Sequence, residues 1–448
     1  MKVDLLVAEI GSTTTLVSAI GIDPPALLGQ GFAATIREEG DVTTVMELAV
    51  EDLAAALKAK ELEWSMIMAA SSAAGGLSMS VHGLVYEMTV KAAREAALGA
   101  GAVVRMITAG KMTANELEKL RRVGPKMILL AGGVDYGEKE TALHNGALIA
   151  ALKLDAPVVY AGNVSARDEL AAIFREAGVK AYFVDNVYPR VDELVVEPAR
   201  RVIQEVFEEH IVTAPGMNRI RSMVGGPILP TPGAVMEACK VLHPLLGDLC
   251  AVDVGGATTD VHSVAGGSPE IQAILESPEP LAKRTVEGDL GIHVNARNLV
   301  GQVGDSLELE LGFNPVPYLD NLQVIPENEQ EIALVKYLRD AACDIAFRRH
   351  AGKIKHLYGP GGRITLASGK DLTGVRTIIG TGGALTRLPG GREALASLAG
   401  EGHGRELYPR AAQVALDRRY IMATCGVLAK RYPGVALSLL LESLELRA

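Results

Sequence analysis

Residues 249–260, LCAVDVGGATTD, determine the fold that we expect for this chain. An apolar run ends at Asp253, two adjacent glycines follow, and a second alternating run leaves through Thr258 and Asp260. Glycine lets the main chain come close to phosphate oxygens and present N–H groups to them. Carboxylates cannot face phosphate directly, because they need Mg²⁺ and its waters in between. The stretch therefore predicts a phosphate-binding hairpin more readily than an ordinary polar β-turn.

A related pattern stands near the start of the chain, where residues 9–15 read EIGSTTT. Strand, acid, glycine and hydroxyl cluster follow in the same order as in the first stretch. Each pattern opens a run of three short predicted strands, at 5–10, 14–20 and 27–34 and again at 249–254, 259–265 and 271–275. Two lobes of similar design, joined near 240–248, are the simplest interpretation. The residues predicted to cradle phosphate are Gly11, Ser12, Thr13, Gly255, Gly256 and Thr258.

A third glycine-rich turn lies in residues 378–389, IIGTGGALTRLP. A buried strand runs into Gly380, Gly382 and Gly383, and Arg387 follows. Such a turn could admit a purine, with the arginine guanidinium stacked on the face of the base. A strand-to-helix turn with a surface arginine explains the pattern equally well.

The order of the remaining elements separates this chain from a plain dinucleotide-binding fold. A helix at 42–57, a strand at 66–70 and a helix at 89–99 follow the first three strands. Strands and helices alternate from 102 to 186, which predicts an inserted parallel sheet. We expect a first lobe over 1–245, enlarged by an insertion near 102–190, and a second lobe over 246–425. The helices at 426–448 are candidates to return to the first lobe.

Composition excludes several classes of function. The 448 residues carry a formal net charge of -10, so we expect no nucleic-acid partner. The four cysteines lie far apart, without the spacing of a disulfide framework or a usual metal site. No uninterrupted apolar run of about eighteen residues occurs, so we expect no membrane span. The start, MKVDLLVAEIGS, goes straight into a strand pattern without a secretory signal, which favours a cytoplasmic protein.

Taken together, the motifs resemble the actin, sugar kinase and heat-shock chaperone superfamily. Its phosphate hairpin one, connecting helix, phosphate hairpin two and adenosine motif would fall, in that order, at Glu9–Thr15, Pro230–Val241, Asp253–Asp260 and Gly380–Pro389. The resemblance implies an α/β fold of two actin-like (ribonuclease H-like) lobes, each a mixed sheet with flanking helices, around a cleft that binds ATP and Mg²⁺.

A narrower resemblance is to the MutL (GlmL) family, which is encoded beside adenosylcobalamin-dependent glutamate mutase. Residues 7–14, 130–137 and 283–291 carry it. It implies an ATP-dependent accessory protein that reactivates or assembles an adenosylcobalamin-dependent mutase, such as glutamate (methylaspartate) mutase. That mutase would be the partner, and homo-oligomerisation stays open.

Within this framework we expect Glu9, Asp253 and Asp260 to handle metal and water, with Glu9 and Asp253 contacting Mg²⁺ through water. Two departures from the superfamily pattern suggest slow turnover. Glu9 stands where most members have Asp, and Leu229 replaces the acid that orients the attacking water in chaperones. A lysine for the γ-phosphate cannot be assigned, and Lys111 and Lys283 are only candidates.

Three other functions fit the same fold. A small-molecule kinase would need a base in line with the γ-phosphate. An iron–sulfur activator of a dehydratase would need clustered cysteines, which the spacing opposes. A structural partner with a degenerate cleft is favoured by Leu229. The glycine-rich stretch Gly132–Gly137 is either a structural turn or a second loop that faces phosphate or a partner.

Overall fold

The computed structural model describes residues 1–11, 13–34, 42–72, 77–100, 102–211, 217–303, 306–320, 322–359, 362–400 and 404–446. Of the predicted site residues, Ser12 lies outside these ranges. The chain forms two compact units. Unit 1 comprises Met1–Ala74, Ala214–Glu276 and Leu281–Ala448, and unit 2 comprises Gly75–Thr213 with Ser277–Pro280.

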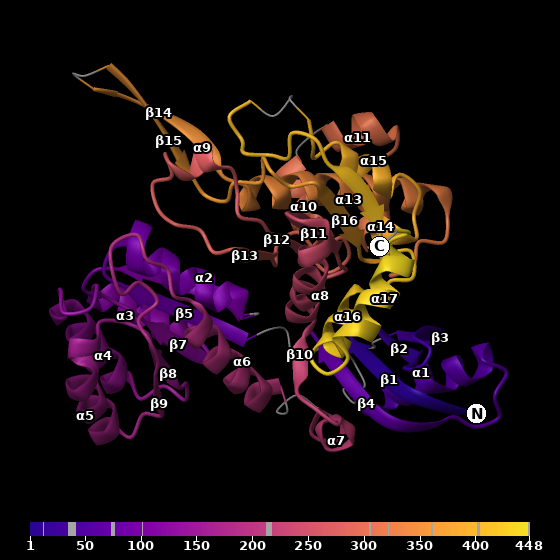
Figure 1. Ribbon diagram of the computed structural model, residues 1–448, viewed down its shortest axis with the longest axis horizontal. Helices are drawn as coiled ribbons and strands as arrows, with labels where there is room; N and C mark the ends of the chain where they lie inside the picture. Colours follow the sequence, from indigo (N-terminus) through magenta and orange to yellow (C-terminus); the bar gives the residue numbers. More distant parts are fainter. Residues whose placement is uncertain are drawn as a thin grey trace. The chain divides into compact units, whose positions relative to one another are not determined.

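The first sheet of unit 1 has the strand order β10-β4-β1-β2-β3 (Figure 1). The first three strands run antiparallel to their neighbours, and β4 and β10 extend the sheet in parallel from β1. The five strands are β1 (Lys2–Ile10), β2 (Thr14–Gly21), β3 (Ala26–Ala34), β4 (Glu63–Ser71) and β10 (Ile228–Pro230). Helix α1 (Val42–Ala56) connects β3 to β4.

The second sheet of unit 1 repeats this topology, with the order β13-β12-β11-β16-β17. Again a three-stranded antiparallel meander is extended by two parallel strands. Its strands are β11 (Leu249–Val254), β12 (Thr259–Val264), β13 (Ala282–Glu287), β16 (Thr377–Thr381) and β17 (Gln413–Leu416). The order 3-2-1-4-5, found twice, is that of the ribonuclease H-like lobes of actin-like proteins. The predicted fold class is therefore confirmed.

One predicted strand is wrong. Residues 271–275 do not form the third strand of the second sheet, because Pro269–Gln272 is the short helix α9. Ser268 caps this helix by accepting a hydrogen bond from the Ile271 N–H at 3.4 Å, and Pro269 occupies its first turn. These helix-start signals override the apolar pattern. The third strand comes ten residues later, as β13.

Strand β11 is buried on both faces, and its alternate residues enter two different cores. Leu249 and Ala251 pack with helix α8 (Thr231–Leu246), whereas Cys250 and Val252 pack with helix α13 (Glu329–His350). This arrangement explains the near-continuous apolar run before Asp253, because both sides of the strand are covered. All four cysteines are buried and unbonded.

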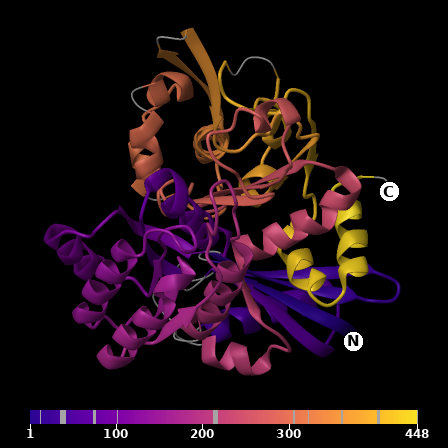
Figure 2. The ribbon, with the colours of Figure 1, turned by 60° about the vertical axis from the view of Figure 1, so that its left-hand side comes forward.

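The core around α8 joins segments from opposite ends of the chain. It contains Leu5 and Val7 of β1 together with Leu439 and Leu440 of the last helix. Helices α16 (Met422–Ala429) and α17 (Pro433–Ser443) lie beside α8 in both views (Figure 1, Figure 2). Gly426 of α16 lies so close to α8 that an added side chain would meet the backbone of Ala234. The C-terminal helices therefore share one core with strands of both sheets and with α8.

The other elements of unit 1 surround the second sheet or extend from it. They are α7 (Met217–Met223), α10 (Ala296–Val303), α11 (Ser306–Leu311), α12 (Val316–Asp320), α14 (Gly383–Thr386), α15 (Gly391–Ala396) and the hairpin of β14 (Lys353–Gly359) with β15 (Gly362–Ser368).

Unit 2 is a parallel sheet with the order β6-β5-β7-β8-β9. In chain order this is 2-1-3-4-5, the order of doubly wound flavodoxin-like sheets. Its elements are β5 (Leu77–Gly83), a π-helix (Tyr86–Val90), α2 (Lys91–Gly99), β6 (Ala102–Ala109), α3 (Ala114–Val123), β7 (Met127–Leu130), α4 (Glu140–Leu152), β8 (Val158–Tyr160), a 3₁₀ turn (Val164–Ala166), α5 (Arg167–Ala177), β9 (Ala181–Phe183) and α6 (Glu197–Ile211).

The glycine-rich loop after β7 is held by a dense set of hydrogen bonds. The Asn163 side chain accepts from the Tyr136 N–H at 2.9 Å and donates to the Gly137 carbonyl oxygen at 3.0 Å. Asn186 donates to the Gly133 carbonyl oxygen at 3.0 Å.

Within the described ranges, no helix is long and apolar enough to span a bilayer.

Candidate nucleotide site

The two hairpins of unit 1 share one backbone hydrogen bond across their turns. The Gly11 N–H donates to the Thr14 carbonyl oxygen at 2.9 Å, and the Gly255 N–H donates to the Thr258 carbonyl oxygen at 2.9 Å. Strand register then makes Glu9 the counterpart of Asp253, because each lies two residues before its glycine. The residue opposite differs, since Glu9 pairs with Leu16 whereas Asp253 pairs with Asp260. The second hairpin therefore carries one acid more than the first.

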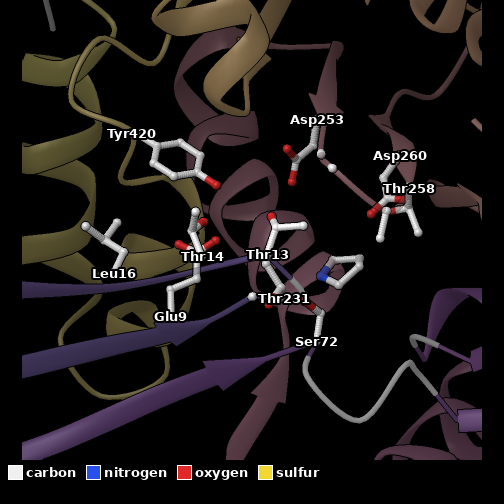
Figure 3. Close-up of a pocket in the computed structure, with 15 residues that line it drawn as sticks. Glu9, Thr13, Thr14, Leu16, Ser72, Thr231, Asp253, Thr258, Asp260 and Tyr420 are labelled. Carbon is white, nitrogen blue, oxygen red and sulfur yellow. The ribbon is translucent and has the colours of Figure 1, made fainter. Parts of the chain in front are cut away.

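The turns of the two hairpins face each other across a pocket (Figure 3). A side chain added to Gly256 would come within 2.9 Å of Thr13 Cγ2, so the Thr13 side chain lies close against the Gly256 backbone. Of the predicted residues, the pocket gathers Glu9, Gly11, Thr13, Asp253, Gly255, Gly256, Thr258 and Asp260. Its other lining residues are Thr14, Leu16, Ser72, Thr231, Pro232, Ala257 and Tyr420.

The carbonyl oxygens of hairpin two are bound by the loop that follows β13. The Ile292 N–H donates to the Gly255 carbonyl at 3.3 Å, and the Asn295 side chain donates to the Ala257 carbonyl at 2.9 Å. The Gly256 carbonyl accepts from His293 and Val294, at 2.9 and 2.8 Å. Because the turn's acceptors are engaged by this loop, the turn does not need to present them to an anion. This arrangement suits a phosphate cradle made of backbone N–H groups.

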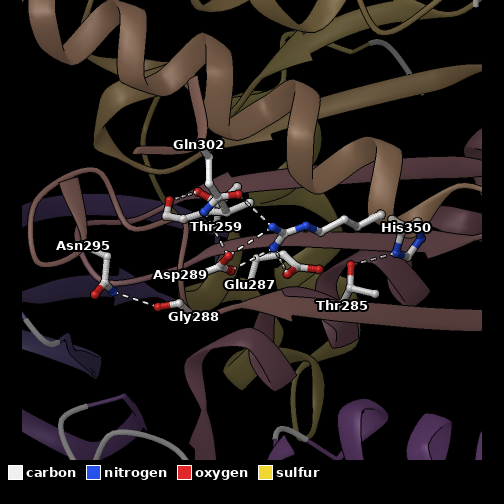
Figure 4. Close-up of polar contacts among 10 residues, drawn as sticks. Thr259, Thr285, Glu287, Gly288, Asp289, Asn295, Gln302 and His350 are labelled. Carbon is white, nitrogen blue, oxygen red and sulfur yellow. Dashed lines mark hydrogen bonds and ion pairs between the residues drawn. The ribbon is translucent and has the colours of Figure 1, made fainter. Parts of the chain in front are cut away.

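The loop that follows β13 is held at its start by ion pairs and hydrogen bonds (Figure 4). Arg349 of α13 donates to Glu287 at 2.6 Å and to both carboxylate oxygens of Asp289, at 2.9 and 3.0 Å. The Gln302 side chain links Arg349 to Asp289, because it accepts a hydrogen bond from Arg349 and donates one to Asp289. These charge-assisted bonds fix the end of β13, from which the loop reaches hairpin two.

Glu9 and Asp260 are buried and Asp253 is half-buried, and loss of solvent around all three raises their pKa values. Burial, with the nearby charges of Asp253 and Asp417, raises the pKa of Glu9 to about 8. Burial, with the charge of Asp417, raises the pKa of Asp253 to about 7. The pKa of Asp260 is also raised, first by burial and then by Asp253. Ionised together, these groups require a cation to neutralise them.

One carboxylate oxygen of Asp260 also indicates that a cation or water is required at this site. Its Oδ1 is buried and has no hydrogen-bond partner among the described residues. In that part of the chain, no three acidic, histidine or cysteine side chains converge tightly enough to ligate a metal directly. The donor set therefore fits Mg²⁺ held through water and phosphate oxygens, not an all-protein cage.

The third glycine turn approaches the site without lining the pocket. Gly382, with a φ of 87°, lies against β11, and an added side chain would come within 2.8 Å of Asp253 Oδ1. Gly380 is in β16, and Gly383 begins α14. Arg387 ends that helix, and its guanidinium carbon lies 5.0 Å from the ring centre of Phe32 in β3. In this structure Arg387 therefore stacks on an aromatic ring of the first lobe.

Asp417 belongs to the same acidic cluster and was not predicted. It follows β17 and accepts hydrogen bonds from Thr381, from Ser443 and from the backbone of Ile421 and Met422, at 2.9, 2.5, 2.8 and 2.8 Å. Burial raises its pKa, while these bonds oppose the rise. The signal was present in the sequence, because the apolar run before Asp417 ends in an acid, as at Glu9 and Asp253.

Neither lysine considered for the terminal phosphate is among the residues that line the pocket. Lys111 belongs to unit 2. Lys283 is buried in β13 and is not among the lining residues. Leu229 is buried in β10, directly before the Pro230-Thr231 step. Thr231, Ser72 and Tyr420 line the pocket, although sequence patterns did not select them as site residues.

Comparison with known proteins identifies the family. A family model described as MutL protein matches residues 5–444. Protein MutL of Clostridium tetanomorphum is 38% identical over 458 residues, which cover 97% of this chain and 98% of that protein. Among solved structures, a diol dehydratase-reactivating factor in nucleotide-free form has 11% identity and a TM-score of 0.38, covering 96% of this chain and 99% of that one. Xylulose kinase from Bifidobacterium adolescentis has 12% identity and a TM-score of 0.33, covering 97% and 93%.

The two structural likenesses are too distant to bear on function. The family match extends over almost the entire chain, and the sequence match covers nearly the full length of both proteins. The resemblance predicted from residues 7–14, 130–137 and 283–291 is thereby confirmed, and this chain belongs to the MutL family.

Proposed function

We propose that this protein binds ATP with Mg²⁺ between its two hairpins, and that it reactivates or assembles an adenosylcobalamin-dependent mutase such as glutamate (methylaspartate) mutase. One observation carries the nucleotide part of the proposal. Two glycine turns that are closed by the same backbone hydrogen bond line one pocket, together with the acids Glu9, Asp253 and Asp260. Paired backbone cradles with acids behind them suit a polyphosphate that arrives with a divalent cation.

The proposed roles follow from position. Backbone N–H groups of Gly11–Thr13 and Gly255–Thr258 would bind phosphate oxygens. Glu9 and Asp253, at the ends of β1 and β11, would hold the metal's waters. Asp260 would orient further water from the facing strand. Mg²⁺, when bound, neutralises phosphate charge.

The proposal includes slow hydrolysis. Leu229 offers no group to orient an attacking water, and no other acid replaces it in β10. Gly380, Gly382, Gly383 and Arg387 would border the adenosine. One face of the Arg387 guanidinium lies over Phe32, and the base would contact its opposite face.

The mutase part of the proposal rests on membership of the MutL family and on the resemblance of the family-specific stretches. Closure of the two lobes over ATP would be the conformational change that acts on the mutase. A nucleotide can shift a partner's state only if the two nucleotide forms of this protein bind that partner with different affinity.

Calorimetry with the Asp253→Asn variant tests the nucleotide site. We expect Mg²⁺-dependent ATP affinity to fall while the fold is kept, because the residue ends a strand at the pocket. Asp248→Asn, just before the other end of β11 and outside the pocket, is the matched control and should bind as the unmodified protein does. Undiminished Mg²⁺-ATP affinity in the Asp253 variant would rule out the assigned site.

A reactivation assay tests the partner. A candidate mutase is inactivated by turnover or by loading with cyanocobalamin, and this protein is added with ATP, Mg²⁺ and fresh adenosylcobalamin. Activity should return only with ATP and should not return with the Asp253→Asn variant. If activity does not return with any mutase encoded nearby, or returns equally well without ATP, the protein does not reactivate the mutase. Assembly of the mutase would then be the better proposal.

A second candidate function is a nucleotide-dependent binding partner without turnover, which Leu229 favours. Measurement of phosphate release from ATP over hours distinguishes a slow ATPase from a partner that binds ATP without hydrolysing it. Client binding that depends on ATP, with no phosphate released, would support the second candidate.

A further inference from the structure

Helix α8 begins at the pocket, and its first two residues, Thr231 and Pro232, line it. The N-terminus of a helix combines unsatisfied N–H groups with a partial positive charge. The residue before the helix, Pro230, makes no side-chain capping bond. The first turn of α8 is thus chemically suited to an anion.

A second observation points to a ligand at this position. Thr231 is 9% exposed, and its hydroxyl oxygen is buried without a hydrogen-bond partner among the described residues. Its side chain lies with the other residues around the pocket (Figure 3). A buried hydroxyl without a partner is costly, and native proteins usually satisfy it with protein, water or ligand.

The charge distribution restricts what that ligand can use. Three acids line the pocket, and no lysine or arginine is among its lining residues. Arg284 is fully buried, and its Nη1 lies 3.6 Å from the position that a side chain on Gly233 would occupy. Its positive charge therefore stands beside the first turn of α8, and it also acts on the carboxylate of Asp260.

We infer that the Thr231 hydroxyl and the first turn of α8 bind the terminal phosphate of ATP and so distinguish ATP from ADP. This inference rests on the proposed function, because it assigns the recognition of one phosphate within the same site. In this assignment Thr231 is a binding residue, and its hydroxyl donates directly to a phosphate oxygen.

This assignment also explains how the bound nucleotide, ATP or ADP, could affect the arrangement of the two lobes. Helix α8 packs against strands of both sheets, and α16 lies on its side. A helix in contact with both lobes can respond to the presence of the terminal phosphate by shifting one lobe against the other.

The test uses the full chain and calorimetry with Mg²⁺-ADP and with a non-hydrolysable ATP analogue. Thr231→Val keeps the branched shape and removes the hydroxyl. Affinity for the ATP analogue should fall about tenfold or more, as for loss of a hydrogen bond to a charged group, while ADP affinity stays within about twofold. Thr231→Ser should retain the preference for the ATP analogue.

Thr424→Val is the matched control. Thr424 is 1% exposed, its hydroxyl oxygen also lacks a partner in the described part of the chain, and it is not a lining residue. This variant should bind both nucleotides normally. An unchanged ATP-to-ADP preference in Thr231→Val, or an equal loss in Thr424→Val, overturns the inference while the proposed function stands. If the unmodified protein binds neither nucleotide, the proposed function fails and the inference fails with it.

Discussion

At the scale of single residues, the buried acids couple ligand binding to pH. The pKa of Glu9 is raised to about 8 and that of Asp253 to about 7, so both are partly protonated near neutrality. Metal binding requires the ionised forms, so Mg²⁺-ATP should displace protons. Affinity should therefore increase from pH 6 to pH 8. Calorimetry in two buffers of different ionisation enthalpy would measure the protons released, and a buffer-independent enthalpy would contradict the prediction.

The same groups affect stability without ligand. In the unfolded chain both carboxyls ionise near pH 4, whereas the folded protein retains their protons to higher pH. Stability should therefore fall as pH rises from about 4 to 8, because the unfolded state then binds fewer protons than the folded one. Thermal unfolding across this range should show the slope, and Glu9→Gln should reduce it. An identical slope in that variant would place its origin elsewhere.

Sequence patterns located acids that end a strand before a glycine, but they missed residues contributed by distant segments. Glu9 and Asp253 were found because each precedes its own glycine turn. Thr231 and Tyr420 enter the pocket through packing of α8 and of the segment after β17, which no local pattern encodes. Asp417 could have been found from its apolar run, but no glycine follows it.

At the scale of elements, the loop after β13 should determine whether hairpin two holds its shape. A side chain at Gly291 would come within 2.3 Å of the Ala257 carbonyl, so Gly291→Ala must displace the hairpin. Gly288→Ala is the control in the same loop, since a side chain there meets nothing within 4 Å. We expect the first variant to lose most of its ATP affinity and the second to retain it. Calorimetry compares them, and equal affinities would show that the loop does not shape the cradle.

The stacking of Arg387 on Phe32 gives a second prediction for this scale. If Arg387 borders the purine, Arg387→Ala should lower the affinities for ATP and ADP by similar factors, because both carry the same base. Phe32→Leu should lower both to a smaller extent, since the aromatic ring under the guanidinium is lost. Competition binding with the two nucleotides would measure this. A loss confined to ATP would place Arg387 at the phosphates instead.

The two glycine-turn hairpins were predictable from the sequence, whereas strand β10 and helix α9 were not. The hairpins β1–β2 and β11–β12 follow from the glycine turn between two apolar runs. Strand β10 has three residues, which is too short to show a period, and it forms only because β4 provides its partner. Residues 269–272 form a helix because Ser268 and Pro269 specify its start.

At the scale of the whole molecule, unit 2 is completed by four residues, Ser277–Pro280, that come from between β12 and β13. Glu279 is almost fully buried and pairs with Lys91 of α2 at 2.5 Å, and Ser277 accepts from the same lysine at 2.8 Å. An insertion can be recognised from alternating strands and helices. The segment Ser277–Pro280, which begins 64 residues after Thr213, cannot be recognised in this way, because no local pattern marks it as part of unit 2.

Removing that carboxylate should loosen unit 2. Glu279→Gln leaves Lys91 without its buried counter-charge, which should cost about 1–3 kcal/mol of local stability. Hydrogen exchange over residues 77–211 should become faster. Glu276→Gln, which removes the more exposed partner of Lys355, is the control and should change little. Unchanged exchange in the Glu279 variant would show that the pair does not stabilise this unit.

The core that joins Leu5 to Leu440 has a consequence for the biosynthesis of the protein. A ribosome adds about 5–20 residues per second, so α16 and α17 emerge roughly 20 to 90 s after β1. For that interval β1 and β4 lack the side chains that cover them, and their apolar faces stay exposed in the nascent chain. Helix α8 arrives about halfway and can cover only part of that surface. The first lobe is thus the first to be synthesised and among the last to finish folding, which makes early termination of translation especially prone to aggregation.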